Sequence, residues 1–178
     1  MGRVKAKVLE SRTMYRGPLF TVRMERVREP GGAVVRRDVV IHPGSVVVLP
    51  VFPGNKILLV RQYRHAVGRY LWELVAGHID PGESPLTAAR RELAEETGYR
   101  ARRFRKLLDL FPTPGFLSEH MVVYSCYGLS PGAARPEEDE RIETRKFALP
   151  ELGRMMRTGR LRDAKSVAAI LYYARFVS

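Results

Sequence analysis

The stretch GHIDPGESPLTAARRELAEETGY, residues 77–99, combines turn signals with a strong helix signal. Its DPGE tetrapeptide has proline at the second and glycine at the third position of a type II turn, where the backbone needs a positive φ. Ser84 is a good N-cap, and the proline after it is tolerated in a first helical turn. Residues 86–97 are rich in strong helix formers, and Gly98 stands where a C′ glycine ends a helix. We therefore predict a tight loop followed by a helix.

Three glutamates share one face of this helix, because Glu92, Glu95 and Glu96 are spaced i, i+3 and i+4. The apolar stripe that should pack inward consists of Leu86, Ala89 and Leu93. Clustered carboxylates repel one another, and a divalent cation such as Mg²⁺ or Mn²⁺ removes that penalty. The alternative is a solvated helix face with glutamate–arginine pairs, for example Arg91 with Glu95.

The whole pattern is more specific than the glutamates alone. It resembles the box of the Nudix hydrolases, written GX5EX7REUXEEXGU. The fixed positions are filled by Gly77, Glu83, Arg91, Glu92, Leu93, Glu95, Glu96 and Gly98. Tyr99 stands where the family usually has an aliphatic residue, at a packing position. The resemblance implies an α/β Nudix fold, with a mixed β-sheet sandwiched between helices and an N-terminal antiparallel β meander.

The resemblance also implies roles for the residues of the box. Glu92 and Glu96 would be the main ligands of two or three Mg²⁺ ions, for which Mn²⁺ could substitute. Glu95 and the carbonyl group of Ala76 would assist them. The structural positions are Gly77, Glu83, Arg91 and Gly98. Of these, the arginine would orient a glutamate by ion pairing, and the glutamate would brace the loop onto the helix.

Length and composition are those of an ordinary globular protein, with 178 residues, 45% of them hydrophobic and 28% charged. No apolar run reaches the length of a membrane span, and residues 1–10 lack the apolar core of a signal peptide. The single cysteine, Cys126, excludes an intrachain disulfide and is expected to be buried. These features indicate a cytoplasmic protein with no membrane partner.

The net charge of +12 could indicate either an anionic small molecule or a nucleic acid as partner. The basic residues are scattered, and the densest cluster, residues 100–106, is not interleaved with a stacking platform of aromatic residues. We therefore expect a small anionic substrate rather than nucleic acid.

The N-terminal part of the chain is predicted to be β-rich. Residues 4–9 and 19–28 have strand patterns, and the chain resumes in extended form from 33 to 41 after a Pro-Gly-Gly break. We divide the chain into a β-rich segment at 1–42 and a Nudix domain at 43–178. In relatives that hydrolyse ADP-ribose such a sheet is exchanged or packed across a dimer, so the resemblance implies a homodimer.

Two apolar, β-branched runs, residues 45–51 and 56–63, should be central strands joined by a tight turn. The second run ends in RQYR, which resembles its counterpart in Nudix enzymes that act on nucleoside diphosphate sugars. There an arginine helps to hold the substrate, so Arg61 or Arg64 is a candidate, and a solvated strand end is the alternative. In relatives a glutamate at the position of Glu73 contacts substrate or metal.

Beyond the box, a short strand is expected at 106–111, followed by the loop PTPGFLSE at 112–119. Pro114 lies fifteen positions after the end of the box and is followed by Gly115 and Glu119. This spacing resembles the ADP-ribose pyrophosphatase branch of the family, in which the loop lies against the adenosine and terminal-ribose sites.

Strands are expected at 121–127 and 142–147, and helices at 149–157 and 164–176. A loop at 131–136 leads into the acidic run EEDE. In ADP-ribose-cleaving relatives a glutamate of such a loop supplies the base for the attacking water, which makes Glu138 and Glu140 candidates. The alternative is a solvated acidic loop.

The resemblance implies Mg²⁺-dependent hydrolysis of the pyrophosphate bond of ADP-ribose or a related nucleoside diphosphate sugar, which gives AMP and ribose 5-phosphate. Three alternatives remain open: a Nudix hydrolase of another substrate (GDP-mannose, FAD, NADH or an oxidised nucleotide), a non-catalytic ligand-sensing module, and an RNA-processing enzyme.

Overall fold

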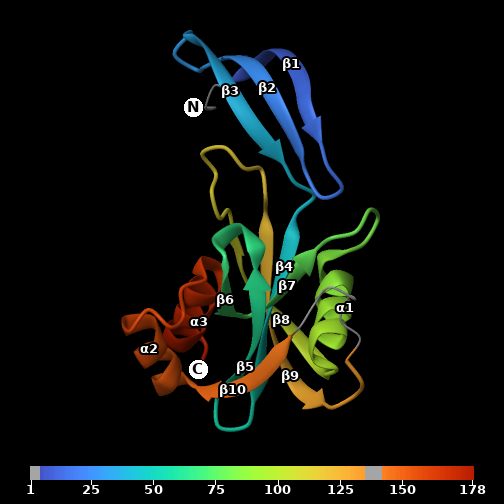
Figure 1. Ribbon diagram of the computed structural model, residues 1–178, viewed down its shortest axis with the longest axis vertical. Coiled ribbons are helices and arrows are strands. Elements are labelled where there is room, and N and C mark those ends of the chain that lie inside the picture. The colour runs from blue at the N-terminus through green and yellow to red at the C-terminus, as the bar shows by residue number, and fades with distance from the viewer. Residues whose placement is uncertain (1–4, 135–141) are drawn as a thin grey trace. The chain divides into compact units, whose positions relative to one another are not determined.

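The computed structural model describes residues 5–134 and 142–178, which form two compact units (Figure 1). One unit comprises the described residues up to Gly44 together with Phe111–His120. The other comprises Ser45–Leu110 and Met121–Ser178, the latter apart from the undescribed stretch.

The first unit is an antiparallel sheet built in chain order from β1 (Lys7–Arg16), β2 (Thr21–Arg28) and β3 (Val34–Ile41). The segment 111–120 lies along β3. The Val40 amide donates a hydrogen bond to the Phe116 carbonyl at 2.8 Å, and the Ser118 amide donates one to the Val40 carbonyl at 2.9 Å. The predicted N-terminal antiparallel meander is thus confirmed.

The second unit is built on a mixed sheet of seven strands, in the order β10-β5-β4-β9-β8, with β6 paired to β5 and β7 paired to β4. The strands are β4 (Ser45–Phe52), β5 (Lys56–Arg64), β6 (Arg69–Glu73), β7 (Val75–His78), β8 (Arg100–Leu110), β9 (Met121–Ser130) and β10 (Glu143–Ala148). The helices are η1 (His65–Val67, a 3₁₀ turn), α1 (Pro85–Thr97), α2 (Leu149–Arg157) and α3 (Ala164–Phe176). The pair β4–β9 is parallel, whereas its neighbours in the sheet are antiparallel.

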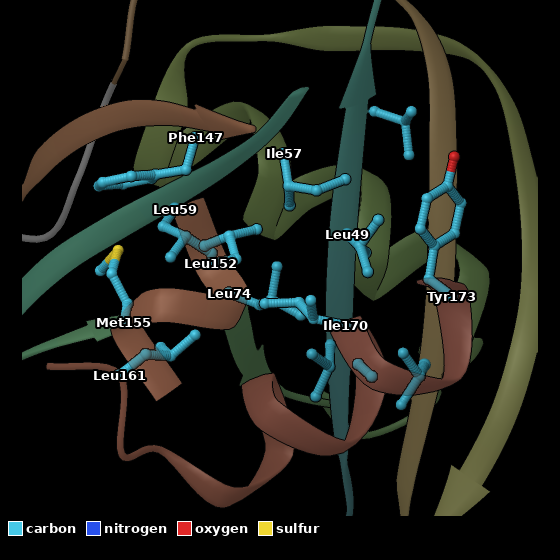
Figure 2. Close-up of a cluster of buried hydrophobic side chains, with 14 residues drawn as sticks. Leu49, Ile57, Leu59, Leu74, Phe147, Leu152, Met155, Leu161, Ile170 and Tyr173 are labelled. Carbon is cyan, nitrogen blue, oxygen red and sulfur yellow. The ribbon is translucent and has the colours of Figure 1, made fainter. Parts of the chain in front are cut away.

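Strand β4 is buried on both faces and separates two cores. Val47, Leu49 and Val51 belong to one buried cluster with residues of α2 and α3. Figure 2 shows Leu49 in this cluster together with Leu152 and Ile170. On the other face, Val46 and Val48 pack with Ala88, Ala89 and Leu93 of α1. Full burial of each large apolar side chain is worth about 1.5–3 kcal/mol, so the two cores fix both helical layers on the sheet. The predicted sheet between helices is confirmed.

The loop before α1 and the ends of that helix match the sequence signals. The Glu83 amide donates to the Asp80 carbonyl at 2.9 Å, and Gly82 has φ 81°, as a type II turn requires. The Ser84 hydroxyl accepts a hydrogen bond from the Thr87 amide at 3.2 Å, which makes it the N-cap. Gly98 ends the helix with φ 71°.

Three local expectations were wrong. Strand β8 begins at Arg100 rather than at residue 106, because its basic first half pairs with β9 while Ala101 and Phe104 pack toward α1. Strand β1 extends to Arg16 through its pairing with β2. In α1, Ala88 is fully buried and Leu86 is only half-buried, so the inward stripe is shifted along the helix.

None of the helices in the described ranges is long and apolar enough to cross a membrane.

We predict that Gly98→Ala lowers the free energy of unfolding by more than about 1–2 kcal/mol, the usual cost of a left-handed alanine. The added Cβ would also lie 2.5 Å from the Gly132 carbonyl oxygen, which is backbone and cannot rotate away. Gly153→Ala is the matched control, because that glycine lies inside α2 with open space around its Cβ position. This control should gain about 0.5–1 kcal/mol. Urea denaturation measures both, and equal effects would contradict the account of Gly98.

Candidate active site

Arg91 joins the loop before α1 to the carboxylates of the helix. Its Nη2 donates to Glu83 Oε2 at 2.9 Å and to the His78 carbonyl at 3.0 Å. Its Nη1 donates to Glu92 Oε1 at 2.7 Å and to Glu95 Oε2 at 3.1 Å. One guanidinium therefore donates hydrogen bonds to three carboxylates, two on its own helix and one on the loop, and it also lies 3.7 Å from the Asp80 carboxylate of that loop. These contacts fix the relative positions of the loop and the helix.

The pKa values of these groups follow from their surroundings. Hydrogen bonds from Arg91 hold the pKa of Glu83 below its usual value, and the Arg91 pKa is raised, first by its hydrogen bonds to Glu83. Burial raises the pKa of Glu92, although the Arg91 charge opposes this shift. A buried carboxylate that is only partly compensated has a strong affinity for a further cation.

Glu92 and Glu96 are buried, with 8% and 5% of their surface exposed, so the alternative of a solvated helix face is wrong for these two residues. Glu95 is more exposed. The carboxylate of Glu92 lies directly against Gly77 of β7, since a Cβ at that position would overlap it. The absent side chain at Gly77 lets a strand and an acidic helix face approach closely, beside Ala76.

The carboxylates of Glu92 and Glu96 and the neighbouring strand backbone offer the type of ligand atom that a hard divalent cation prefers. These atoms are all oxygens, two of them belong to buried carboxylates, and they lie on one helix face next to a bare stretch of strand backbone. Within residues 5–134 and 142–178, no three acidic, histidine or cysteine side chains converge as a ready-made ion site. A bound ion would therefore take further oxygens from backbone, water or substrate, as Mg²⁺ commonly does.

A further buried carboxylate, away from α1, belongs to Glu73 at the end of β6, with 2% of its surface exposed. Arg64 donates to it through Nε at 2.8 Å and through Nη2 at 2.9 Å. Lys165 of α3 donates to it as well, at 2.5 Å. Burial alone would raise the Glu73 pKa, but these two cations reverse the shift and lower it.

Sequence reasoning missed the contribution of α3 to this second cluster. Asp163 caps the helix by accepting a hydrogen bond from the Ser166 amide at 3.0 Å, and it also binds the Lys165 ammonium group at 2.9 Å. The Ser166 hydroxyl accepts a hydrogen bond from the Leu74 amide at 2.7 Å. The pattern Asp-x-x-Ser at the start of the predicted helix could have indicated the cap, but not its contact with β6.

The structure separates the remaining candidates. Arg61 is not part of the Glu73 cluster: it lies 3.3 Å from Glu143 and 4.9 Å over the ring of Tyr70. Three loop candidates belong to the other compact unit: Pro114, Gly115 and Glu119. Two base candidates lie outside the described residues: Glu138 and Glu140.

The chain is similar to known proteins over almost its whole length. A family model described as NUDIX domain matches residues 41–170. The chain is 37% identical to ADP-ribose pyrophosphatase of Mycobacterium tuberculosis, over 93% of this chain and 81% of that protein. It is 33% identical to methanol dehydrogenase activator of Bacillus methanolicus (97% and 95% covered) and 33% identical to ADP-ribose pyrophosphatase of Bacillus subtilis (97% and 94% covered).

Among solved structures, a crystal structure of ADP compounds hydrolase superposes with a TM-score of 0.84 at 26% identity. The match covers 99% of this chain and 96% of that one. The likeness therefore includes the architecture of both units.

We predict that Arg91→Met lowers the melting temperature at pH 7 in EDTA and that this loss shrinks as the pH falls below about 4. The reason is that Arg91 depresses the pKa of Glu83. The stability that this pair contributes is present above the ordinary carboxylate pKa and is lost as the pH falls through the folded-state pKa. Circular dichroism melts from pH 7 to pH 3 measure it.

Arg90→Met is the matched control, since Arg90 is the exposed neighbour on the same helix and stacks over Phe104 at 5.7 Å. It should change the melting temperature little, and equally at each pH. A loss in Arg91→Met that did not depend on pH would show that its ion pairs are not the source of the stability.

Proposed function

Because the chain belongs to the NUDIX domain family and is a Nudix pyrophosphohydrolase, we propose that it hydrolyses ADP-ribose or a related nucleoside diphosphate sugar to AMP and ribose 5-phosphate. The observation that carries the proposal is the acidic face of α1, in which Glu92 and Glu96 are both buried and Glu92 lies against the strand backbone at Gly77. The name of the two similar pyrophosphatases supports ADP-ribose as the substrate.

Glu92 and Glu96 would hold Mg²⁺, or Mn²⁺ in its place, with Glu95 and the Ala76 carbonyl assisting. Bound there, two or three such ions would neutralise the pyrophosphate charge and stabilise the transition state. Arg91 keeps the carboxylates in place through its hydrogen bonds to Glu92 and Glu95.

Two other groups complete the proposed reaction. The guanidinium of Arg64 forms a two-point fork on Glu73, with one hydrogen bond from Nε and one from Nη2. Its remaining N–H groups would donate to the pyrophosphate. Glu138 or Glu140 would take the proton from the attacking water. The proposed partner is thus a small nucleoside diphosphate, in a cytoplasmic homodimer. The exposed apolar residues on the sheet of the first unit and in its β1–β2 connection support dimer formation: Val8, Met14, Tyr15, Leu19, Phe20 and Val34.

A substrate panel with Mg²⁺ in a coupled phosphatase assay tests the proposal. We predict the highest kcat/KM for ADP-ribose, compared with GDP-mannose, FAD, NADH, a dinucleoside polyphosphate and an oxidised dGTP. Preference for another diphosphate would keep the reaction and replace the substrate. Activity on none of them, with Mg²⁺ or Mn²⁺, would overturn the proposal in favour of a ligand-sensing role.

We predict that Glu96→Gln lowers kcat by at least about a hundredfold, the usual loss when a charge-stabilising group is removed from an active site. The substitution is nearly isosteric, so the melting temperature in EDTA should stay near that of the wild type. Glu151→Gln is the control, because that half-buried glutamate of α2 forms an ion pair with the exposed Arg145 of β10. Near-wild-type turnover in Glu96→Gln would mean that the metal ligands were assigned wrongly.

A further inference from the structure

The first turn of α3 contacts the end of β6 at two neighbouring residues. Lys165 binds the side chain of Glu73 at 2.5 Å, and the Ser166 hydroxyl accepts the backbone N–H of Leu74 at 2.7 Å. Asp163 holds both of these α3 residues, through Lys165 Nζ at 2.9 Å and the Ser166 amide at 3.0 Å. The helix start is thus a clamp on the strand that leads to Ala76 and Gly77.

The Glu73 carboxylate connects Lys165 of this clamp to Arg64. Its Oε1 accepts from Arg64 Nε, and its Oε2 accepts from both Arg64 Nη2 and Lys165 Nζ. The two cations therefore share one oxygen of a carboxylate that is only 2% exposed. A guanidinium held by a two-point fork has a fixed plane and direction, unlike one held by a single hydrogen bond.

Arg64 differs from Glu73 in being accessible. Its side chain is 39% exposed, whereas that of Lys165 is 12% exposed. The fork uses two of the five N–H groups of a guanidinium, so three remain for another acceptor. The negative charge of Glu96 acts on Arg64, which places Arg64 within electrostatic reach of the acidic face of α1.

We propose that Lys165 is a positioning residue, which holds the Glu73 carboxylate in place so that Glu73 aims the guanidinium of Arg64 at a phosphate oxygen of the substrate. This inference rests on the proposed function, because it assumes that Arg64 binds the substrate. Lys165 itself touches no reacting atom. Without Lys165, the buried carboxylate of Glu73 has only the partly exposed Arg64 as its cation. We therefore expect the two hydrogen bonds between Arg64 and Glu73 to be held less firmly.

If Lys165 had a purely structural role, a different result is expected. Its removal would lower stability without a selective change in KM, and its effect on KM would not depend on the presence of Glu73. The positioning role instead requires that Lys165 act through Glu73, so the effects of the two substitutions on KM must not add.

The test is a double-mutant cycle of Lys165→Met and Glu73→Gln, measured by KM and kcat for ADP-ribose with Mg²⁺ and by calorimetric Kd for ADP-ribose in EDTA. Lys165→Met should raise KM and Kd about tenfold, the loss expected for one weakened charged hydrogen bond, with kcat within about twofold. Lys165→Arg should restore most of the affinity, and Lys165→Met should add little in the Glu73→Gln background.

Two controls match the change in charge and the change in stability. Lys106→Met removes a lysine that pairs with Asp109 at 2.8 Å on the exposed surface of β8. Ile170→Val shortens a buried side chain of α3 itself. Neither should change KM, although Ile170→Val should lower the melting temperature.

Unchanged KM in Lys165→Met, a rise no larger than in Ile170→Val, or additive effects with Glu73→Gln would overturn the positioning role alone. If another panel substrate is hydrolysed best, the cycle is run on that substrate, and the same outcomes decide. A wild-type enzyme that hydrolyses no substrate would instead overturn the proposed function, and this inference with it.

Discussion

A carboxylate that is taken out of water must be matched by a cation, and the second unit depends on this constraint in two places. Glu92 lies under the guanidinium of Arg91, and Glu73 lies between Arg64 and Lys165. Desolvation pushes both pKa values upward, yet only the Glu73 pKa ends below its usual value, because two cations reach it. Glu92 pairs with Arg91, a cation that three other carboxylates also contact: Asp80, Glu83 and Glu95. The cluster at α1 is therefore the less compensated of the two, as suits a site that takes up a further cation.

The path from the core to this cluster runs through β4. Because β4 is buried on both faces, its place in the sheet is fixed, and β7 pairs with it from Val48–Val75 to Ser45–His78. Ala88 and Leu93 pack on one face of β4 and so set the distance between α1 and the sheet. Gly77 then lies where the carboxylate of Glu92 arrives, and a larger residue would keep strand and helix apart. The site geometry thus follows from apolar packing, with glycine at the point of closest approach.

Local signals predicted the elements of this site well. Four of these elements depend on contacts within about one helix length, where periodicity and propensity are informative. They are the turn at Gly82, the N-cap at Ser84, the helix end at Gly98 and the spacing of the glutamates. Strand β8 failed this test, because Arg100–Lys106 has a charged sequence and becomes a strand only through pairing with β9. Strand β8 lies at the edge of the sheet, and its pairing with β9 holds it extended although its composition does not favour a strand.

Burial and long-range contacts were the features that the sequence left undetermined. Periodicity put Glu92 and Glu96 on one face but did not say that the sheet covers that face. The contact of Ser166 with Leu74 spans 92 residues, and nothing in either segment indicates the other. Such contacts arise only once the sheet order is set, which is why the α1 cluster could be predicted and the α3 clamp could not.

The basic excess of +12 shows why the number of cations matters less than the environment of their partners. Lys165 and Lys106 both bind a carboxylate closely, at 2.5 and 2.8 Å. The exposed fractions of the side chains in these pairs are 12% and 2% for Lys165–Glu73, but 53% and 38% for Lys106–Asp109. Water and salt screen the exposed pair, so its contribution is small. Loss of Lys165 would leave the buried carboxylate of Glu73 with Arg64 as its only cation. Because of this difference in burial, we expect removal of Lys165 to cost more than removal of Lys106.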